Sequence, residues 1–224
     1  PVTGGNVSLY NETLDSNGKP QPIYPTPVIG MVGRVENIDK VVGQGWRNSG
    51  DGIYLLGSND GNTLGGSEYL AVVHHTVAGQ PPQVDFDLEK AVQKACRHGI
   101  AQGWVNAAHD CAEGGLSVAL AEMAIAGKLG AEINLSNSDQ RLDTLLFGES
   151  ASRIVVAVAP ANQSVWEAYL TSQSFPWQKL GVVGTAQGNL TFIDAKNNTL
   201  IDLPVSALTE PWQTAIASRL QSQD

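Results

Sequence analysis

The sequence predicts an α/β or α+β domain that runs from about Gly50 to the end of the chain. Apolar runs rich in β-branched residues recur between segments whose apolar residues have helical spacing. Of the 224 residues, 42% are hydrophobic and only 16% are charged, which is enough apolar material for a core. Strands that alternate with helices are typical of a sheet covered by helices. We therefore expect a domain at residues 50–224, with residues 1–49 ending a preceding domain.

The first part of the chain predicts isolated strands around a loop. Residues 1–8 and 28–35 are apolar enough for strands, and a glycine turn follows within the first of them. Residues 11–27 contain four prolines and the pair Asn17-Gly18. Because proline removes a backbone donor and restricts the residue before it, this stretch is expected to be a loop.

The second part of the chain shows clearer periodicity. Asp85 is a plausible N-cap, and the residues after it place an apolar face at helical spacing as far as Ile100. The other predicted helices are residues 116–126, residues 163–172 and a last helix with Trp212, Ile216 and Leu220. The predicted strands are residues 53–57, 105–109, 154–159, 180–185 and 190–194, and the last two are expected to pair around Gly188-Asn189.

Composition limits the partners. The net charge is -9 without any run of lysine or arginine, which argues against nucleic acid. Backbone N–H groups can still bind a small phosphorylated molecule. No apolar stretch approaches the roughly 20 residues that span a bilayer, so no membrane association is expected. Cys96 and Cys111 match no zinc spacing, and we expect buried thiols in a reducing, cytoplasmic setting.

The first candidate site is the loop at residues 4–12. The pair Gly4-Gly5 lets the backbone approach a ligand and present N–H groups to an anion. Asn6 and Ser8, with two further side chains downstream, supply the oxygen ligands that magnesium prefers. A polar hairpin turn is the alternative, because short glycine motifs are weak indicators.

The second candidate lies between a predicted strand and a predicted helix. His109 and Asp110 stand at the carboxyl end of the strand, where α/β sheets usually hold ligands. Gly114 and Gly115 begin the helix and direct free N–H groups and the positive end of its dipole toward an anion. The alternative is that the glycines permit tight packing while Asp110 caps the helix.

The third candidate directly precedes the strand at residues 154–159. Glu149 and Arg153 could hold a phosphorylated sugar, or each other as a surface ion pair. Nothing in the sequence matches a Ser-His-Asp triad, a P-loop lysine motif or a Rossmann fingerprint. The residues alone therefore indicate a phosphate site without lysine, in a nucleotide or sugar-phosphate protein.

Five motifs together resemble one family. They are GNVSLYNE at residues 5–12, PTPVIG at 25–30, LGGSEY at 64–69, HDCAEGGL at 109–116 and FGES at 147–150. In this order they are similar to the second half of phosphoribosylformylglycinamidine synthase. The glycine-pair helix start is shared more loosely with aminoimidazole ribonucleotide synthase, selenophosphate synthetase and thiamine monophosphate kinase.

The resemblance implies an aminoimidazole ribonucleotide synthase-like C-terminal domain: a mixed sheet with packed helices, preceded by the end of an N-terminal sheet domain. It implies ATP at Gly5, Mg²⁺ at Asn6 and substrate at Ser8. No catalytic residue is expected here, because the family's catalytic histidines lie in its first half. His109, Asp110, Gly114 and Gly115 remain a possible anion loop. Since Pro1 starts the chain, we expect a fragment of a longer polypeptide that is inactive in isolation.

The reaction implied is the ATP-dependent conversion of formylglycinamide ribonucleotide and glutamine-derived ammonia to the amidine in purine biosynthesis. Its partners would be a glutaminase subunit and a small accessory subunit of the synthase complex. The chain ends in polar residues after Leu203 without a nucleophilic cysteine motif, which favours a separate glutaminase. The alternatives are another superfamily enzyme, such as selenophosphate synthetase, and a non-catalytic nucleotide-binding module.

Overall fold

The computed structural model describes residues 2–8, 10–59, 63–135 and 140–221, and it divides into two units, Pro1–Ile38 and Asp39–Asp224. The first unit contains a hairpin of β1 (Glu12–Leu14) and β2 (Pro20–Pro22). Its turn is held by Asp15, whose Oδ1 accepts the N–H groups of Asn17 and Lys19 at 2.9 Å each. These bonds lower the pKa of Asp15. The expectation of a loop at residues 11–27 is therefore wrong for the two short strands β1 and β2.

The two strands predicted in the first unit are not formed in its described residues. Residues 2–8 and 28–35 carry no strand pairing. Val28 and Val32 are 92% and 100% exposed. A strand is stable only when its backbone groups pair with a neighbour, and the first unit offers these segments no sheet. Pro1 lies outside the described residues.

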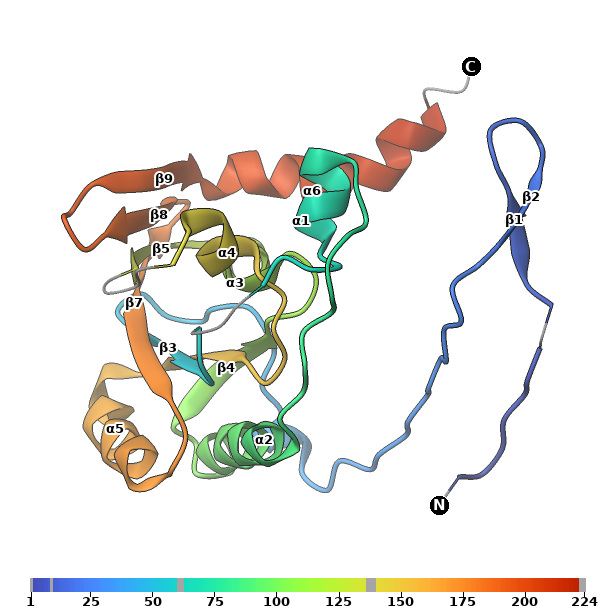
Figure 1. Ribbon diagram of the computed structural model, residues 1–224. Coiled ribbons are helices and arrows are strands. Elements are labelled where there is room, and N and C mark those ends of the chain that lie inside the picture. Colours follow the sequence, from blue (N-terminus) through green and yellow to red (C-terminus); the bar gives the residue numbers. More distant parts are fainter. Residues whose placement is uncertain (1, 9, 60–62, 136–139, 222–224) are drawn as a thin grey trace. The chain divides into compact units, whose positions relative to one another are not determined.

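The second unit is built on a seven-stranded mixed sheet with the order β4-β6-β3-β7-β5-β8-β9 (Figure 1). All neighbouring strands are antiparallel except β5 and β8, which are parallel. The strands are β3 (Gly52–Leu56), β4 (Val105–Asp110), β5 (Leu129–Leu135), β6 (Ile154–Val158), β7 (Trp177–Ala186), β8 (Asn189–Asp194) and β9 (Thr199–Pro204). The helices are α1 (Glu68–His74), α2 (Phe86–Ala101), α3 (Gly115–Gly127), α4 (Leu142–Phe147), α5 (Gln163–Ser172) and α6 (Val205–Gln221).

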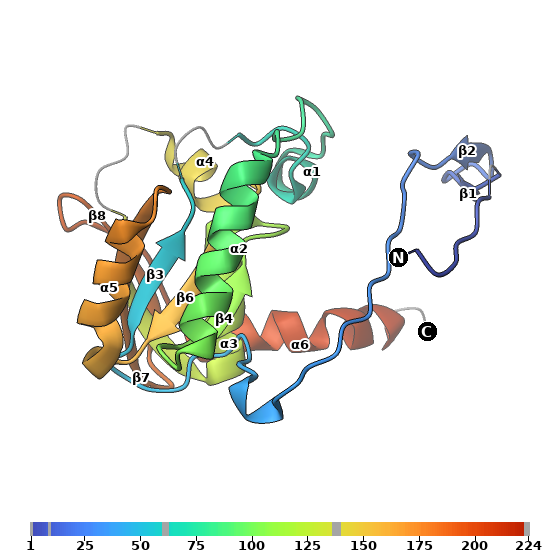
Figure 2. The same cartoon turned by 90° about the horizontal axis from the view of Figure 1, so that it is seen from below.

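The sheet separates two hydrophobic cores, and β3 contributes to both. Ile53 and Leu55 pack into the core shared with α3, α4 and the start of α6. Tyr54 and Leu56 point to the other face, into the core with α2 and α5. Figure 2 shows α2 and α5 on the same side of the sheet. Side chains alternate between the faces of a strand, so a strand buried on both faces must be apolar throughout.

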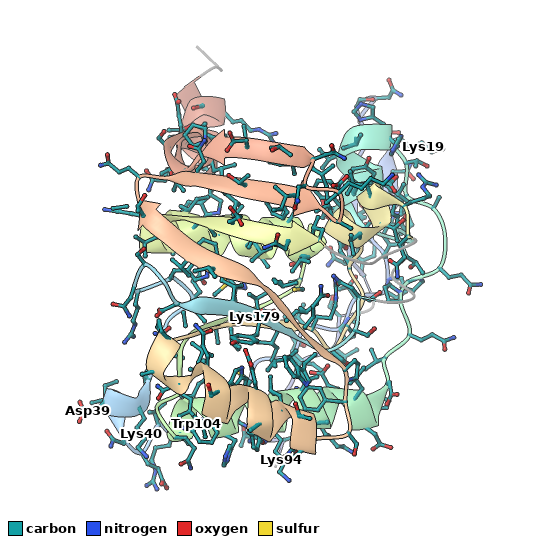
Figure 3. All side chains as sticks on the ribbon, turned by 90° about the vertical axis from the view of Figure 1, so that its left-hand side faces the viewer. Lys19, Asp39, Lys40, Lys94, Trp104 and Lys179 are labelled. Atoms are coloured by element: carbon teal, nitrogen blue, oxygen red, sulfur yellow. The ribbon has the colours of Figure 1, made fainter. Side chains whose placement is uncertain are left out.

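Helix α5 is tied to the sheet by a polar cluster within reach of solvent. The Tyr54 hydroxyl donates to Glu167 Oε1 at 2.6 Å. Lys179, labelled on β7 in Figure 3, donates to Gln163 Oε1 at 2.8 Å and lies 3.5 Å from Glu167. Burial, followed by the bond to Glu167, raises the pKa of Tyr54. The buried phenol thus keeps its proton and a hydrogen-bond partner.

The fold class and most elements of the second unit agree with the sequence prediction. Asp85 caps α2 by accepting the N–H groups of Asp87 and Leu88, and α5 has the predicted bounds. Helices α1 and α4 and strands β5 and β9 were missed, and α6 begins at Val205, seven residues before Trp212. No helix in the described ranges is long and apolar enough to span a membrane.

The predicted pairing of the strands around Gly188-Asn189 is wrong. Strand β5 lies between β7 and β8 and pairs with both. A strand from an earlier part of the chain is inserted there, which local sequence does not reveal.

Near the start of the second unit, Trp46 is 2% exposed in the core, so residues near it pack with the second unit. The domain boundary at residue 49 stays a prediction.

The rates of amide hydrogen exchange should differ between the two units. We expect the amides of residues 28–35 to exchange at nearly the rate of an unfolded chain, because they have no strand partner. The amides of β3, paired on both sides, should be among the slowest. Hydrogen–deuterium exchange with mass spectrometry tests this, on material shown by light scattering to be monomeric. Strong protection of residues 28–35 in the monomer would contradict the structure of the first unit.

Candidate functional site

The loop that carries Gly5, Asn6 and Ser8 is exposed, and residues 4–8 form neither strand nor turn. A side chain built at Gly5 would meet no atom within 4 Å. Ser8 Oγ donates to the Tyr10 carbonyl at 3.1 Å, and the Tyr10 hydroxyl donates to Glu12 Oε1 at 2.8 Å. The bond to Glu12 raises the pKa of Tyr10. The hairpin alternative is therefore wrong for residues 4–8, and the backbone there is open to a ligand.

Asn6 is the one residue expected at magnesium, and its amide oxygen is of the type that this ion prefers. A single amide cannot hold Mg²⁺, which needs near-octahedral oxygen coordination. Within the described ranges, no group of three or more His, Cys, Asp or Glu is placed to bind a metal. The donor type thus fits Mg²⁺, and most of its ligands would have to come from a phosphate, water or other protein segments.

Three chain segments meet at one edge of the main sheet. Ile154, at the start of β6, pairs with Leu56 on β3 and with Asp110 on β4. The antiparallel register therefore brings the chain after β3 and after β4 beside the chain before β6. The motif at residues 109–116 and the motif at 147–153, far apart in sequence, lie together there. The sequence predicted each motif without relating one to the other.

Gly114 and Gly115 both adopt a backbone that favours glycine. Their φ angles are 78° and 65°, and Gly114 is the N-cap of α3. As a glycine, the N-cap residue has no side chain of its own to accept a helix N–H, and the Asp110 side chain is 74% exposed. The suggestion that Asp110 caps α3 is therefore wrong. A side chain at Gly115 would collide with the Gly148 carbonyl oxygen, so this glycine serves close packing.

Glu149 occupies the space in front of α3. One of its carboxylate oxygens, Oε1, accepts the N–H of Gly114 at 2.8 Å and the N–H of Glu68 at 2.9 Å. Glu68 is the first residue of α1, so a single oxygen joins the starts of two helices. Both N–H groups belong to the unpaired donors of a helix start, which a carboxylate satisfies well.

Arg153 is buried beneath this junction, with 2% of its surface exposed. Its guanidinium donates to the carbonyl oxygens of Gly148 and Ser150, the latter at 3.0 Å, and to Asn59 Oδ1 at 2.8 Å. Burial lowers the pKa of Arg153, while the neighbouring Cys111 and Glu149 oppose that shift. The expected surface ion pair of Glu149 and Arg153 is wrong, because each binds backbone groups instead.

His109 links β4 to two helices. Its Nε2 lies 3.0 Å from Glu122 Oε2 on α3, and its Nδ1 lies 2.8 Å from the Asp110 carbonyl oxygen. Glu122 also accepts from Trp212 Nε1 on α6, at 3.4 Å. The ring is only 12% exposed and both of its nitrogens face oxygen atoms. The ring is therefore held between β4 and α3, in the arrangement of a packing histidine.

A pocket of about 410 Å³ opens beside the same edge. Its wall is formed by Ser150 and Ser152 before β6, and by the chain that leads into α2, including Gln80 and Asp85. Among the residues that the structure describes, Asp85 is the only charged one that lines it. Pro81, Pro82, Leu88 and Ala151 also line it. A pocket of mixed apolar and neutral polar lining with one carboxylate suits an uncharged ligand better than phosphate.

The sequence profile described as "AIR synthase related protein, C-terminal domain" matches residues 48–193. This match covers more than half of the chain. The chain belongs to this family. The glycine-pair helix start, which in sequence resembles that of aminoimidazole ribonucleotide synthase, lies within the matched residues.

Curated relatives extend the similarity over nearly the whole chain. "Phosphoribosylformylglycinamidine synthase subunit PurL" from Synechocystis sp. is 91% identical over 222 residues, which are 99% of this chain and 29% of the relative. The subunit of the same name from Trichormus variabilis is 58% identical over 224 residues, 98% of this chain and 29% of the relative. The chain thus spans less than a third of the relatives it matches.

Solved structures agree on the AIR synthase-related fold. Thermotoga maritima PurL complexed with FGAR superposes with a TM-score of 0.66 at 20% identity, over 77% of this chain and 30% of that one. The same protein complexed with ATP gives 0.61 at 22% identity, over 77% and 28%. These likenesses confirm the predicted mixed sheet with packed helices.

Two variants, each with a glycine replaced by alanine, test the close packing at the start of α3. Gly115→Ala adds a Cβ against Gly148 and also strains a positive φ, whereas Gly103→Ala strains a φ of 72° in open space. We expect Gly103→Ala to lower the free energy of unfolding by about 1–2 kcal/mol, and Gly115→Ala to lower it by at least about 2 kcal/mol more. Urea denaturation measures both. If both variants lost the same free energy of unfolding, the contact between Gly115 and Gly148 would not be the close packing inferred here.

The two cysteines should be unreactive in the native protein. Burial raises the pKa of Cys96 and of Cys111 to about 11 each. At pH 8 the thiolate is then on the order of one part in a thousand, and only the thiolate is nucleophilic. We expect a disulfide reagent such as DTNB to react slowly with the native chain, faster as the pH rises toward 11, and rapidly in urea. A rapid full equivalent at pH 8 would contradict their burial.

Proposed function

We propose that this chain is the C-terminal part of the synthetase subunit of a phosphoribosylformylglycinamidine synthase. The observation that carries the proposal is the 91% identity to that subunit of Synechocystis sp. over 99% of the chain. The five sequence motifs stand in the order of the second half of such a subunit. Selenophosphate synthetase and a non-catalytic module are less well supported, because neither accounts for GNVSLYNE at residues 5–12.

The proposed overall reaction joins ammonia to the amide carbon of formylglycinamide ribonucleotide. ATP transfers its γ-phosphoryl group to the amide oxygen, ammonia attacks the carbon, and phosphate leaves with that oxygen, so the products are the amidine, ADP and phosphate. Mg²⁺ bound with ATP offsets phosphate charge. T. maritima PurL has been solved with FGAR and with ATP, which supports these two as the ligands.

Within this reaction, the residues of the chain have binding roles. Gly5 has no side chain, and a Cβ placed there would have no neighbour within 4 Å, so its backbone can approach ATP closely. Asn6 would give Mg²⁺ one amide oxygen, and Ser8 would give the substrate a hydroxyl. The anion loop of His109, Asp110, Gly114 and Gly115 would face an anion or a neighbouring loop. No residue here is assigned to the chemical step.

The proposal extends to the domains and partners. Residues 1–49 would end one synthase-like domain, and residues 50–224 would form the last one. A separate glutaminase subunit and a small accessory subunit would complete the complex in the cytoplasm, where ammonia is released from glutamine. The chain alone should then be inactive, because it spans 29% of its relatives.

Substitution of Asn6 in the full-length subunit tests the binding roles. Asn6→Ala removes an oxygen ligand, so we expect turnover at limiting Mg²⁺ to fall at least about tenfold, with partial recovery at high Mg²⁺. The assay supplies ATP, ammonia and formylglycinamide ribonucleotide and measures ADP release. Asn17→Ala, in the exposed β1–β2 turn, is the matched control. Unchanged turnover of Asn6→Ala would overturn the role of this loop. Amidine formation by the isolated chain would overturn the proposal that the catalytic residues lie elsewhere in the full-length subunit.

A further inference from the structure

We propose that the loop that ends at Gly114, the N-cap of α3, binds the Glu149 carboxylate as its anion. The loop thus selects a carboxylate of its own chain and excludes phosphate. The inference refines the anion role proposed above and rests on that role only for its biological setting. Its starting point is the convergence of two backbone donors, at 2.8 Å and 2.9 Å, on the single atom Glu149 Oε1.

The donors come from two different helices. Gly114 is the N-cap of the 13-residue helix α3, and its N–H is one of the groups that a helix start leaves unpaired. Glu68 begins α1, whose N-cap Ser67 accepts from the N–H of Leu70 instead. Ser67 and Glu149 thus satisfy different donors of α1. Two backbone N–H groups that converge on one oxygen atom can bind an oxyanion, and the oxyanion present is the Glu149 carboxylate.

The segment that carries Glu149 is fixed from below. Arg153 donates to the carbonyl oxygens on both sides of it, at Gly148 and Ser150, and is almost wholly buried. Gly115 lies so close to Gly148 that a Cβ there would collide with its carbonyl oxygen. The backbone at Glu149 therefore cannot shift away from α3 without breaking the bonds of Arg153 or opening the contact between the two glycines.

A phosphate arriving at Gly114 would meet a carboxylate already in place. Two anions that compete for the same N–H groups repel each other, and the net charge of -9 adds to the repulsion. The glycine pair therefore resembles a phosphate loop in sequence, while its donor is used within the fold. Glu149 determines specificity by occupying the site.

Removal of the carboxylate should reveal an oxyanion site. We expect Glu149→Ala to melt roughly 3–10 °C below the wild type, because two helix-start donors lose their partner. Sodium formate, the smallest carboxylate, should then raise the melting temperature of the variant with the logarithm of its concentration. Inorganic phosphate should do so to a lesser degree. The wild type should show only the general stabilisation that excluded salts such as phosphate give to folded proteins, so the binding response is the rise of the variant beyond that of the wild type in the same salt.

The matched control is Glu113→Ala, which removes the same charge from an exposed position next to Gly114. It should melt near the wild type and show no response to formate. Glu149→Gln keeps one oxygen acceptor and should melt between Glu149→Ala and the wild type. If Glu149→Ala does not fold in chloride, refolding it in formate replaces the melting experiment, and recovery of the fold is the expected result.

Four results would overturn the inference. They are wild-type stability of Glu149→Ala, a folded Glu149→Ala without response to either anion, an equal phosphate response in the wild type, and failure of formate to restore an unfolded Glu149→Ala. All readouts concern stability, whereas the proposed function is tested by turnover. A failure here would therefore leave the ligase proposal intact, and a failed ligase assay would leave this inference intact.

Discussion

The burial of β3 on both faces is the constraint on which the second unit depends. Every residue of this strand is buried, and it pairs with β6 on one side and β7 on the other. Because its side chains alternate between the faces, one five-residue segment supports two cores. Helices must therefore cover both faces of the sheet near β3. Farther out, β5, β8 and β9 turn one face to solvent, as Figure 3 shows, and exposed Glu132 and Asp202 stand on those strands.

The same pairing places the candidate site of this unit. The register of β3, β6 and β4 brings the chain ends at Leu56, Ile154 and Asp110 into line. The glycine start of α3 then faces the segment before β6, which supplies Glu149 and is held by Arg153. The chemistry of this edge is thus mainly structural: a carboxylate and a guanidinium each satisfy backbone groups that would otherwise be unpaired.

The first unit has the opposite character. The large apolar side chains that the structure describes there are exposed, as at Val28 and Val32, and the candidate ligands Asn6 and Ser8 are exposed as well. An ATP–Mg²⁺ site needs more oxygen ligands than this loop holds. The proposed binding roles therefore depend on protein outside this segment, in keeping with relatives more than three times as long as the chain.

Local patterns in the sequence were sufficient for the fold class, the Asp85 cap of α2, the bounds of α5 and most strands of the second unit. These features depend on periodicity and on neighbours a few residues away. The position of β5 between β7 and β8, and the use of Glu149 at Gly114 rather than at Arg153, required the tertiary structure. Both are set by segments tens of residues apart in the chain, which compete for the same backbone donors and acceptors. Sequence names the groups that need partners, and only packing decides which partner each group receives.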